Sequence, residues 1–485
     1  MSEENGWSDL VRHSRVRISF GCSELSSIGN NFYKVEVSWR LVLAGKIVLI
    51  MPYLQISMKS VARMAMLMCV MGGMTLAAAW AGVTQQQVRV WRQEMRGALY
   101  IPTPLPALDA RNHGSFSPVP GVIAERVTYG TEYGMRIPAI IYRPEHVAGK
   151  VPGMVVVNGH GADKTSWYDF YTGILYAKAG AVVVTYDMIG EGERNDEHQN
   201  GEDECERMVA MPGVPQRMGG LMVTDAMQGV SYLRSLPYVN RKRIALLGFS
   251  LGSFVSVLTG AVDTDFHALF LTGGGDLDGP GGYWDKSQCV MTQSAPYKAL
   301  RFLGDRGAAI YTLNARRGPT FVWNGTDDTV VAIPTHGPKF FANLRQRTIA
   351  MNGSAKNVFT THFDPGASHR PAWVLRAPAE WLEKELRFPN WTPQKVAEMP
   401  VINIGEWAKA HGVYLDDGQR RLNRDAGLEA LAAGVPGLKP SQLDVFSMSE
   451  WKQKRGKLVW AAWAEHATAA AVRENLRVGH DVPEK

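Results

Sequence analysis

The chain has 485 residues, enough for two or three average domains or for one α/β domain with large additions. Apolar residues make up 45% of it and charged residues 20%, a composition that excludes a disordered or fibrous protein. The formal net charge of +6 is small for this length, and no segment is densely basic, so we expect no nucleic-acid partner.

The N-terminal region contains a pattern typical of secretory signals. Residues 1–57 have no clear amphipathic period, whereas Met58–Arg63 carries two positive charges and precedes an uncharged stretch, Met64–Ala79. Ala79 and Ala81 then form the small-x-small pattern that signal peptidase reads.

We therefore predict a signal peptide over residues 58–81 and interpret residues 1–57 as a misassigned upstream extension. Cleavage predicts a secreted or periplasmic protein without stable membrane association. The alternative is an uncleaved membrane anchor, because Met64–Val83 is twenty residues long and uncharged.

The mature chain is expected to begin with a lead-in over residues 82–120, made of a helix at Gln85–Leu99 and a Pro-rich connector. Ile123–Gly130 and Met135–Tyr142 then flank a short polar turn. This pattern predicts a β-hairpin.

From residue 121 onward, predicted strands and helices alternate. Short, mostly apolar runs are typical of strands buried on both faces, and apolar residues at helical spacing recur between them. The predicted strands after the hairpin are Met154–Asn158, Ala181–Tyr186, Arg243–Leu247, Ala268–Thr272, Thr320–Trp323 and Val358–His362. The alternation predicts an α/β domain over residues 121–392, with a mostly parallel sheet and helices on both faces. Residues 393–485 break the pattern and are predicted to form a C-terminal extension packed on this domain.

A candidate nucleophile follows the strand Arg243–Leu247. Gly248-Phe249-Ser250-Leu251-Gly252 has the form Gly-x-Ser-x-Gly and precedes an apolar-periodic helix. In that setting the serine lies on a sharp turn, where side chains at the glycine positions would clash with the strand and helix. The strand–turn–helix context therefore predicts that Ser250 is a nucleophile, rather than part of an ordinary small-residue turn.

A serine hydroxyl needs a base and an acid that orients the base. After a nucleophile in this setting, the acid comes first along the chain and the histidine second. Two aspartates follow the strand Thr320–Trp323, at the end of a strand where an open α/β sheet carries its site. We favour Asp328, because it fits a Gly-x-x-Asp-x-x-Val pattern from Gly325 to Val331. Asp327 is interpreted as a capping or solvated neighbour.

Three histidines follow the predicted acid. His336 lies at an apparent helix start and His362 lies within a predicted strand, so both are interpreted as structural. His369 lies in a loop just past the last strand, from which an imidazole can reach the serine. We predict that His369 is the base.

The oxyanion formed during acyl transfer needs two converging N–H donors. One is expected from Leu251, the residue after the nucleophile. The other is expected from the loop after the first buried strand, where we assign Ala162, with Gly161 as the alternative. The side chain of His160 is interpreted as bracing this loop.

Four motifs in order carry a resemblance to a known family: Gly159-His160-Gly161, Asp187–Arg194, Leu236–Ile244 and Gly248–Gly252. Together they resemble the dienelactone-hydrolase-like and acetyl-xylan-esterase-like branch of the α/β-hydrolases, close to the prolyl-oligopeptidase catalytic domain, over about residues 121–390.

The resemblance implies an α/β-hydrolase fold and a triad carried by Ser250, Asp328 and His369. It also implies acetylated or otherwise esterified plant polysaccharides or oligosaccharides as substrates. Two features depart from the family. The best-known dienelactone hydrolases use a cysteine where this chain has Ser250, and residues 82–392 leave no room for the propeller of prolyl oligopeptidases.

Three further residues are candidates for substrate contact. Glu191 and Arg194 begin an acidic segment that is interpreted as a solvated loop, with a bound calcium ion as the alternative. Trp284, with Tyr283, follows the Gly-rich insert Gly273–Gly282 and is expected either to stack on a sugar or acyl group or to pack in the core.

The four cysteines include no Cys-x-x-Cys pair, and the chain has no His-Glu-x-x-His, so we expect neither a metal nor a cofactor. If Ala81 is the cleavage point, Cys205 and Cys289 remain in the mature chain. In an oxidising compartment they either form a disulfide or stay as two thiols.

The sequence thus predicts a secreted serine carboxylesterase that acts on ester substrates through an acyl-enzyme and resembles acetyl xylan esterases. One alternative is a prolyl-oligopeptidase-like serine peptidase, which would need a clamp for a peptide terminus. Another is a non-catalytic secreted binding protein on a hydrolase scaffold, against which the order of the candidate triad argues.

Overall fold

A computed structural model describes residues 82–198, 214–277, 283–415 and 427–466, apart from the side chains of 214–217, and the backbone of 39–43 and 46–50. The predicted signal peptide and Cys205 lie outside these residues, as do parts of the acidic segment, of the Gly-rich insert and of the C-terminal extension. Within the part of the chain described, no helix combines the length and the apolar character needed to cross a bilayer.

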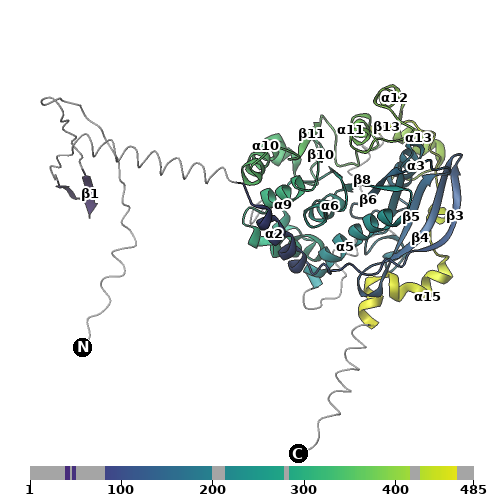
Figure 1. Cartoon of the computed structure of the whole chain (residues 1–485), viewed down its shortest axis with the longest axis horizontal. Coiled ribbons are helices and arrows are strands. Elements are labelled where there is room, and N and C mark those ends of the chain that lie inside the picture. The colour runs from purple at the N-terminus through teal and green to yellow at the C-terminus, as the bar shows by residue number, and fades with distance from the viewer. Residues whose placement is uncertain are drawn as a thin grey trace, which may run out of the picture. The chain divides into compact units, whose positions relative to one another are not determined.

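The chain forms two compact units, Met1–Ala81 and Gly82–Lys485. In the first, strands β1 (Trp39–Leu43) and β2 (Lys46–Ile50) pair antiparallel. The second contains a nine-stranded sheet in the order β11-β10-β9-β8-β6-β7-β5-β4-β3 (Figure 1). Its strands are β3 (Arg111–Val119), β4 (Val122–Gly130), β5 (Arg136–Pro144), β6 (Val151–Val157), β7 (Val182–Tyr186), β8 (Val239–Phe249), β9 (Ala268–Thr272), β10 (Thr320–Gly325) and β11 (Thr360–Asp364).

The six neighbouring strands β7, β6, β8, β9, β10 and β11 all pair in parallel. At the other end of the sheet, β5 is antiparallel to β7, β4 to β5 and β3 to β4. The sheet is therefore mostly parallel with helices around it, which confirms the predicted fold class. Because the parallel strands share one direction, the segments that follow β8, β9 and β10 all emerge at the same edge of the sheet.

The predicted hairpin is present as β4 and β5, which pair from Val122 opposite Pro144 to Gly130 opposite Arg136. Arg111–Val119, which the sequence placed in the Pro-rich connector, instead forms the edge strand β3. Most of its residues are exposed, so it lacks the apolar alternation by which a half-buried strand is identified.

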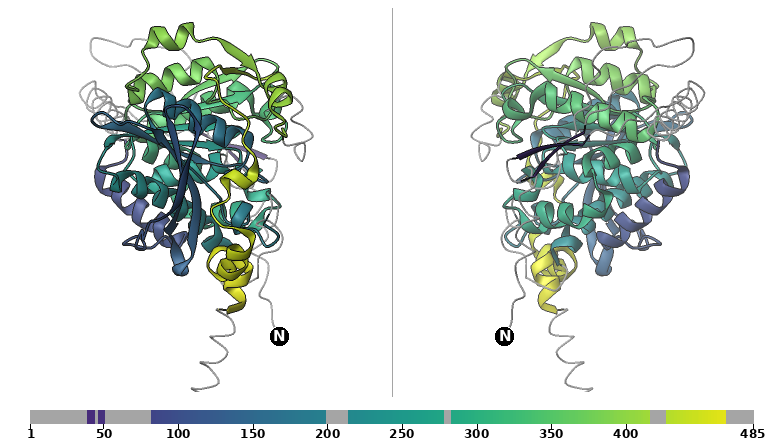
Figure 2. Two further views of the ribbon diagram at one scale, coloured as in Figure 1. Left: turned by 90° about the vertical axis from the view of Figure 1, so that its right-hand side faces the viewer. Right: turned by 90° about the vertical axis from the view of Figure 1, so that its left-hand side faces the viewer.

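Helices cover both faces of the sheet (Figure 2). The longer ones are α2 (Gln85–Ala98), α3 (Trp167–Ala179), α5 (Val214–Ser235), α6 (Leu251–Val262), α9 (Arg306–Ala315), α10 (Ile333–Asn352), α11 (Arg376–Leu386), α13 (Ile404–His411) and α15 (Met448–Leu458). Shorter elements are α7 (Tyr283–Lys286), α8 (Ala295–Ala299), α12 (Pro393–Glu398), α14 (Pro440–Leu443), β12 (Val401–Asn403) and β13 (Glu429–Leu431), the last two forming an antiparallel pair.

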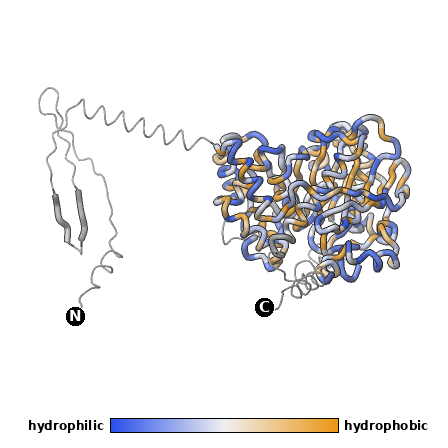
Figure 3. The backbone as a smooth tube through the Cα atoms, turned by 60° about the horizontal axis from the view of Figure 1, so that its bottom comes forward, coloured by the Kyte–Doolittle hydropathy of each residue, from blue (hydrophilic) through white to orange (hydrophobic). Residues whose placement is uncertain are grey.

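The sheet divides the core in two. Along β6, Val155 and Val157 join the apolar cluster beneath α5 and α6, whereas Met154 and Val156 join the cluster beneath α3. Hydrophobic segments accordingly lie inside the body and hydrophilic ones at its surface (Figure 3). A strand that is buried on both faces has a continuous apolar sequence, which is why β6 could be predicted.

The C-terminal extension packs mainly on the α3 side. The ring of Trp407 lies 5.2 Å from that of Tyr171, whose hydroxyl donates to the carbonyl of Leu431 at 2.7 Å. Trp451 belongs to the same apolar cluster. The extension thus shares a core with the sheet through residues that include Trp407, Leu431 and Trp451.

Candidate active site

Ser250 lies on a strained turn between β8 and α6. It has φ 54° and ψ −117°, a positive φ that costs a residue with a side chain about 1–3 kcal/mol. Its N–H donates to the carbonyl of Thr272 at 3.0 Å, and its carbonyl accepts from the N–H of Ser253 at 2.9 Å. These bonds hold the residue at the start of α6, in the strand–turn–helix setting expected of a nucleophile.

The two glycines of the motif are required by close approaches. A Cβ on Gly248 would lie 2.4 Å from the carbonyl oxygen of Gly252, and one on Gly252 would lie 2.0 Å from that of Val157. No side chain fits at such distances. The helix can therefore meet the sheet tightly enough for Ser250 to stand at the edge of β8.

The predicted acid and base are hydrogen-bonded to each other. His369 Nδ1 lies 2.8 Å from Asp328 Oδ2, and both side chains are almost fully buried. Asp328 Oδ1 accepts the N–H groups of Val330 at 3.0 Å and Val331 at 3.3 Å, which fixes the carboxylate. With Nδ1 engaged, the imidazole has Nε2 left for proton transfer.

Thr272, the last residue of β9, connects Ser250 to the histidine loop. Its carbonyl accepts from Ser250, while its hydroxyl donates to the carbonyl of Arg370 at 2.9 Å. The imidazole of His369 lies 4.8 Å from the ring of Phe249, between centroids. A Cβ on Gly273 would lie 2.7 Å from His369 Cε1. The structure thus brings His369 against the turn that holds Ser250.

The other predicted alternatives lie elsewhere. Asp327 is exposed and accepts from the hydroxyl of Thr326. His336 Nδ1 lies 3.1 Å from Asp276, and His362 stacks on Trp323 with 3.7 Å between ring centroids.

Ser250 opens into a cavity of about 480 Å³. Its lining includes His160, Leu251, Trp284, Lys286 and Val331. The volume is that of a small-molecule site. Trp284 also stacks on Phe254 at 4.6 Å and donates through Nε1 to the carbonyl of Asp276, so it is both a core residue and a wall of the cavity.

The loop predicted to supply the second oxyanion donor lies beside Ser250. A Cβ on Gly159 would lie 3.0 Å from Ser250 Cβ, and His160 lines the cavity. Ala162 is buried in the apolar cluster, and Gly161 donates its N–H to Glu191 Oε1 at 2.8 Å. Burial, with a smaller effect of the neighbouring His369, lowers the pKa of His160 to about 4, so its imidazole is neutral at pH 7. His160, interpreted from the sequence as a brace, is therefore also a wall of the cavity.

Glu191 and Arg194 are buried in the segment after β7. The carboxylate of Glu191 holds the Gly161 N–H, as described above, and Arg194 Nη1 pairs with Asp225 at 2.5 Å. Neither is among the lining residues of the cavity. Their contacts tie the segment after β7 to the rest of the fold.

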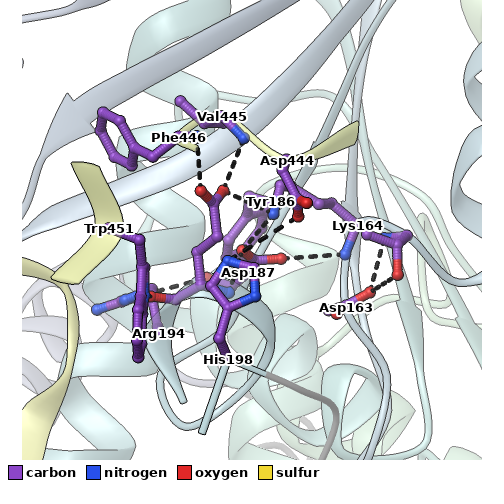
Figure 4. Close-up of polar contacts among 12 residues, drawn as sticks. Asp163, Lys164, Tyr186, Asp187, Arg194, His198, Asp444, Val445, Phe446 and Trp451 are labelled. Atoms are coloured by element: carbon purple, nitrogen blue, oxygen red, sulfur yellow. Dashed lines mark hydrogen bonds and ion pairs between the residues drawn. The ribbon is translucent and has the colours of Figure 1, made fainter. Parts of the chain in front are cut away.

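A buried ionic network joins that segment to the loop after β6 (Figure 4). Lys164 Nζ lies 2.6 Å from Asp187 and 2.9 Å from Glu193, with no exposed side-chain surface on any of the three. Asp187 also accepts the backbone N–H groups of Lys164 at 3.2 Å and Glu193 at 3.0 Å. Burial raises the pKa of Asp187 to about 7, against the opposing effect of the Lys164 ammonium.

The C-terminal extension completes this network. Glu193 accepts the N–H groups of Val445 at 3.0 Å and Phe446 at 2.8 Å, and its carbonyl accepts from Trp451 Nε1 at 2.8 Å (Figure 4). Pairs this distant in sequence leave no local spacing signal, so sequence reasoning missed the role of Lys164 and Glu193.

Cys289 lines the cavity and is disulfide-bonded. The other three cysteines, Cys22, Cys69 and Cys205, lie outside the described residues. Among the described residues, no group of three or more His, Cys, Asp or Glu side chains is arranged to hold a metal ion.

Comparison with known proteins gives a family match. The family model described as acetyl xylan esterase (AXE1) matches residues 109–272, which run from the start of β3 to the end of β9. A comparison with curated protein sequences finds no match.

Several solved structures are similar in fold. Methylesterase BT1017 is 16% identical over 84% of this chain and 79% of its own, with a TM-score of 0.51. Acetyl xylan esterase 1 from Thermoanaerobacterium sp. JW/SL YS485 is 16% identical over 63% of this chain and 98% of its own, with a TM-score of 0.41. Glucuronoyl esterase from Solibacter usitatus is 14% identical over 62% of this chain and 92% of its own, with a TM-score of 0.45.

The sheet order, the turn at Ser250 and the family match agree with the resemblance seen in the motifs. The chain has the fold of the α/β-hydrolases, and its residues 109–272 are similar to the acetyl xylan esterase family.

Proposed function

We propose that this protein is a serine carboxylesterase that removes acyl groups, acetyl foremost, from carbohydrates through an acyl-enzyme. The observation that carries the proposal is the juxtaposition at one sheet edge of the strained Ser250 turn and the buried Asp328–His369 pair. A buried carboxylate bonded to Nδ1 of an imidazole is the arrangement that a serine nucleophile needs.

In the first half-reaction, Ser250 Oγ attacks the ester carbonyl carbon while its proton passes to His369 Nε2. The tetrahedral oxyanion accepts N–H bonds from the start of α6, at Leu251, and from the loop after β6. The C–O bond to the alcohol then breaks, and the imidazolium returns the proton to the leaving oxygen. Asp328 stabilises the imidazolium throughout.

In the second half-reaction, water attacks the acyl-enzyme. His369 takes the water proton and then gives it to Ser250 Oγ as the acyl–serine bond breaks. Carboxylic acid and free enzyme are released, so no proton or electron is left over. A neutral His160 beside the site suits this cycle, because a second positive charge would oppose formation of the imidazolium.

The match of residues 109–272 to the acetyl xylan esterase model supports acetyl as the acyl group and a polysaccharide as the alcohol. Leu251, Val330 and Val331 give the cavity apolar walls beside the nucleophile, which suit a small acyl group.

Secretion is part of the proposal. The charged, apolar and small-residue segments of 58–81 support export, and a disulfide at Cys289 suits an oxidising compartment.

The proposal is tested with p-nitrophenyl acetate and acetylated xylan, measuring p-nitrophenol and acetate release. We expect the parent protein to hydrolyse both and Ser250→Ala to lose at least about 10³-fold in kcat. Ser231→Ala, which removes a hydroxyl on α5 outside the cavity, serves as the matched control. A parent protein inactive on every acyl length would favour a binding protein, and cleavage of peptides but not esters would favour a peptidase.

A further inference from the structure

A second cavity, of about 530 Å³, lies between the antiparallel end of the sheet and α15. Figure 2 shows the C-terminal segment running beside these strands. The cavity shares no lining residue with the one at Ser250. It is large enough for one or two sugar residues.

The lining of this second cavity is basic. Arg111 and Arg136 come from β3 and β5, and Lys454 and Lys457 come from α15. His113 and His466 complete the titratable side chains of the lining, which contains no Asp or Glu among the described residues.

Among the described residues, the carboxylate that forms ion pairs with these cations is that of Asp109. Asp109 pairs with Arg111 at 2.6 Å and with Arg136 at 2.8 Å. Lys454 and Lys457 make no ion pair within 4.0 Å in the described part of the chain, and both are exposed. The cavity therefore keeps an excess of positive charge that a ligand can neutralise.

The positive charges of these residues affect the pKa of His113, which lines the cavity. Burial lowers the pKa of His113, and Arg136 and Lys454 lower it further, while Glu193 and Glu450 oppose the shift. The ring of His113 packs edge-on against Phe446 at 4.9 Å, and its Nε2 lies 3.0 Å from the hydroxyl of Thr128. The Thr128 hydroxyl also accepts from Arg136 Nε at 2.9 Å, so these polar groups fix the Arg136 guanidinium in the wall of the cavity.

We propose that this cavity is an ancillary site for an acidic sugar, a uronate residue of the polysaccharide whose esters the protein cleaves. Arginine and lysine recognise carboxylates, and neighbouring polar groups and an apolar wall at Phe446 suit a sugar ring. The polysaccharide part of the proposal rests on the proposed function. Binding of acidic chain segments here would raise the effective concentration of ester groups at Ser250.

Isothermal titration calorimetry tests the site with trigalacturonate, neutral xylotriose and sodium sulfate as probes. We expect trigalacturonate to bind, more weakly as salt is raised from 50 to 300 mM, and xylotriose not to bind. The double variant Lys454→Ala/Lys457→Ala should raise the Kd for trigalacturonate at least about tenfold. Lys452→Ala, an exposed lysine of the same helix outside the cavity, is the control and should leave the Kd unchanged.

Kinetics separate this site from the catalytic one. The double variant should keep its kcat/KM on p-nitrophenyl acetate but show a raised KM on acetylated pectin. Failure of trigalacturonate to bind, or binding unaffected by loss of both lysines, overturns the proposal. Sulfate binding as tight as trigalacturonate would mean a simple anion site and would also overturn the sugar assignment. A parent protein inactive on p-nitrophenyl acetate would contradict the proposed function, whereas the calorimetry would still decide this site.

Discussion

Lys164 and Asp187 form an ion pair at 2.6 Å with no exposed surface on either side chain. Lys164 belongs to the loop that passes beside Ser250, and Asp187 follows β7. The pair therefore ties the segment after β7 to the loop beside Ser250, and its contribution is to the position of that loop rather than to the chemistry.

Removing one partner of this pair should destabilise the fold. Lys164→Met leaves Asp187 and Glu193 buried without their cation, so we expect a loss of about 3–5 kcal/mol in the free energy of unfolding. Urea denaturation followed by circular dichroism measures it. Lys150→Met, an exposed lysine before β6, should change stability by less than about 0.5 kcal/mol. A loss for Lys164→Met as small as that of the control would refute the role of the pair.

The choice between the two aspartates after β10 can be tested directly. Asp328→Asn removes the charge bonded to His369 Nδ1, so kcat on p-nitrophenyl acetate should fall by about 10³–10⁴-fold. Asp327→Asn alters an exposed neighbour and should leave kcat within about twofold. The reverse result would transfer the acid role to Asp327.

A methyl group at residue 273 should displace the base. Gly273→Ala places a Cβ 2.7 Å from His369 Cε1, so we expect a fall in kcat larger than any fall in melting temperature explains. Gly304→Ala is the matched control, because Gly304 also has a positive φ, of 70°, but nothing lies within 4 Å of its added Cβ. An equal fall in kcat in the two variants would show that backbone strain, and not the contact with His369, causes the loss of activity.

Glu191 should act by positioning the loop after β6. Glu191→Ala removes the acceptor of the Gly161 N–H, and we expect kcat to fall by about tenfold or more with little change in KM. Glu191→Gln keeps an amide oxygen at that position and should recover most of the activity. A rise in KM with unchanged kcat would instead indicate contact with substrate.

Stability should depend on the protonation of Asp263, at the end of α6. Burial raises its pKa from 3.8 to about 6, so the folded protein holds this proton more strongly than the unfolded chain does. Its contribution to stability is therefore present below about pH 4 and is lost as the pH rises to about 6. We expect the melting temperature of Asp263→Asn, relative to that of the parent protein, to increase as the pH is raised from 4 to 7. A constant difference across this range would rule out the raised pKa.

The sequence was informative wherever structure is local. The buried strands β6, β7 and β8 are continuous apolar runs, and the glycines around Ser250 reflect contacts within one turn. The order of Ser250, Asp328 and His369 followed from the strands they come after. Each of these signals lies within a few residues of the feature it predicts.

The features that sequence reasoning missed depend on distant partners or on exposure. Strand β3 has no apolar alternation because it is an exposed edge. Lys164 and Glu193 look like surface residues until the C-terminal extension covers them. The basic cavity combines residues of the consecutive strands β3, β4 and β5 with residues of α15, which lies far from them in the chain.

The hydrogen bonds from Val445 and Phe446 to Glu193 span 252 and 253 residues. During synthesis, the nascent chain must therefore carry the Glu193 carboxylate without these donors until residues 445 and 446 have been translated. A premature stop codon just before Val445 would spare Ser250, Asp328 and His369 but leave the Glu193 carboxylate with Lys164 and without its two backbone donors. Such a product would be a substrate for quality-control proteases rather than a smaller enzyme.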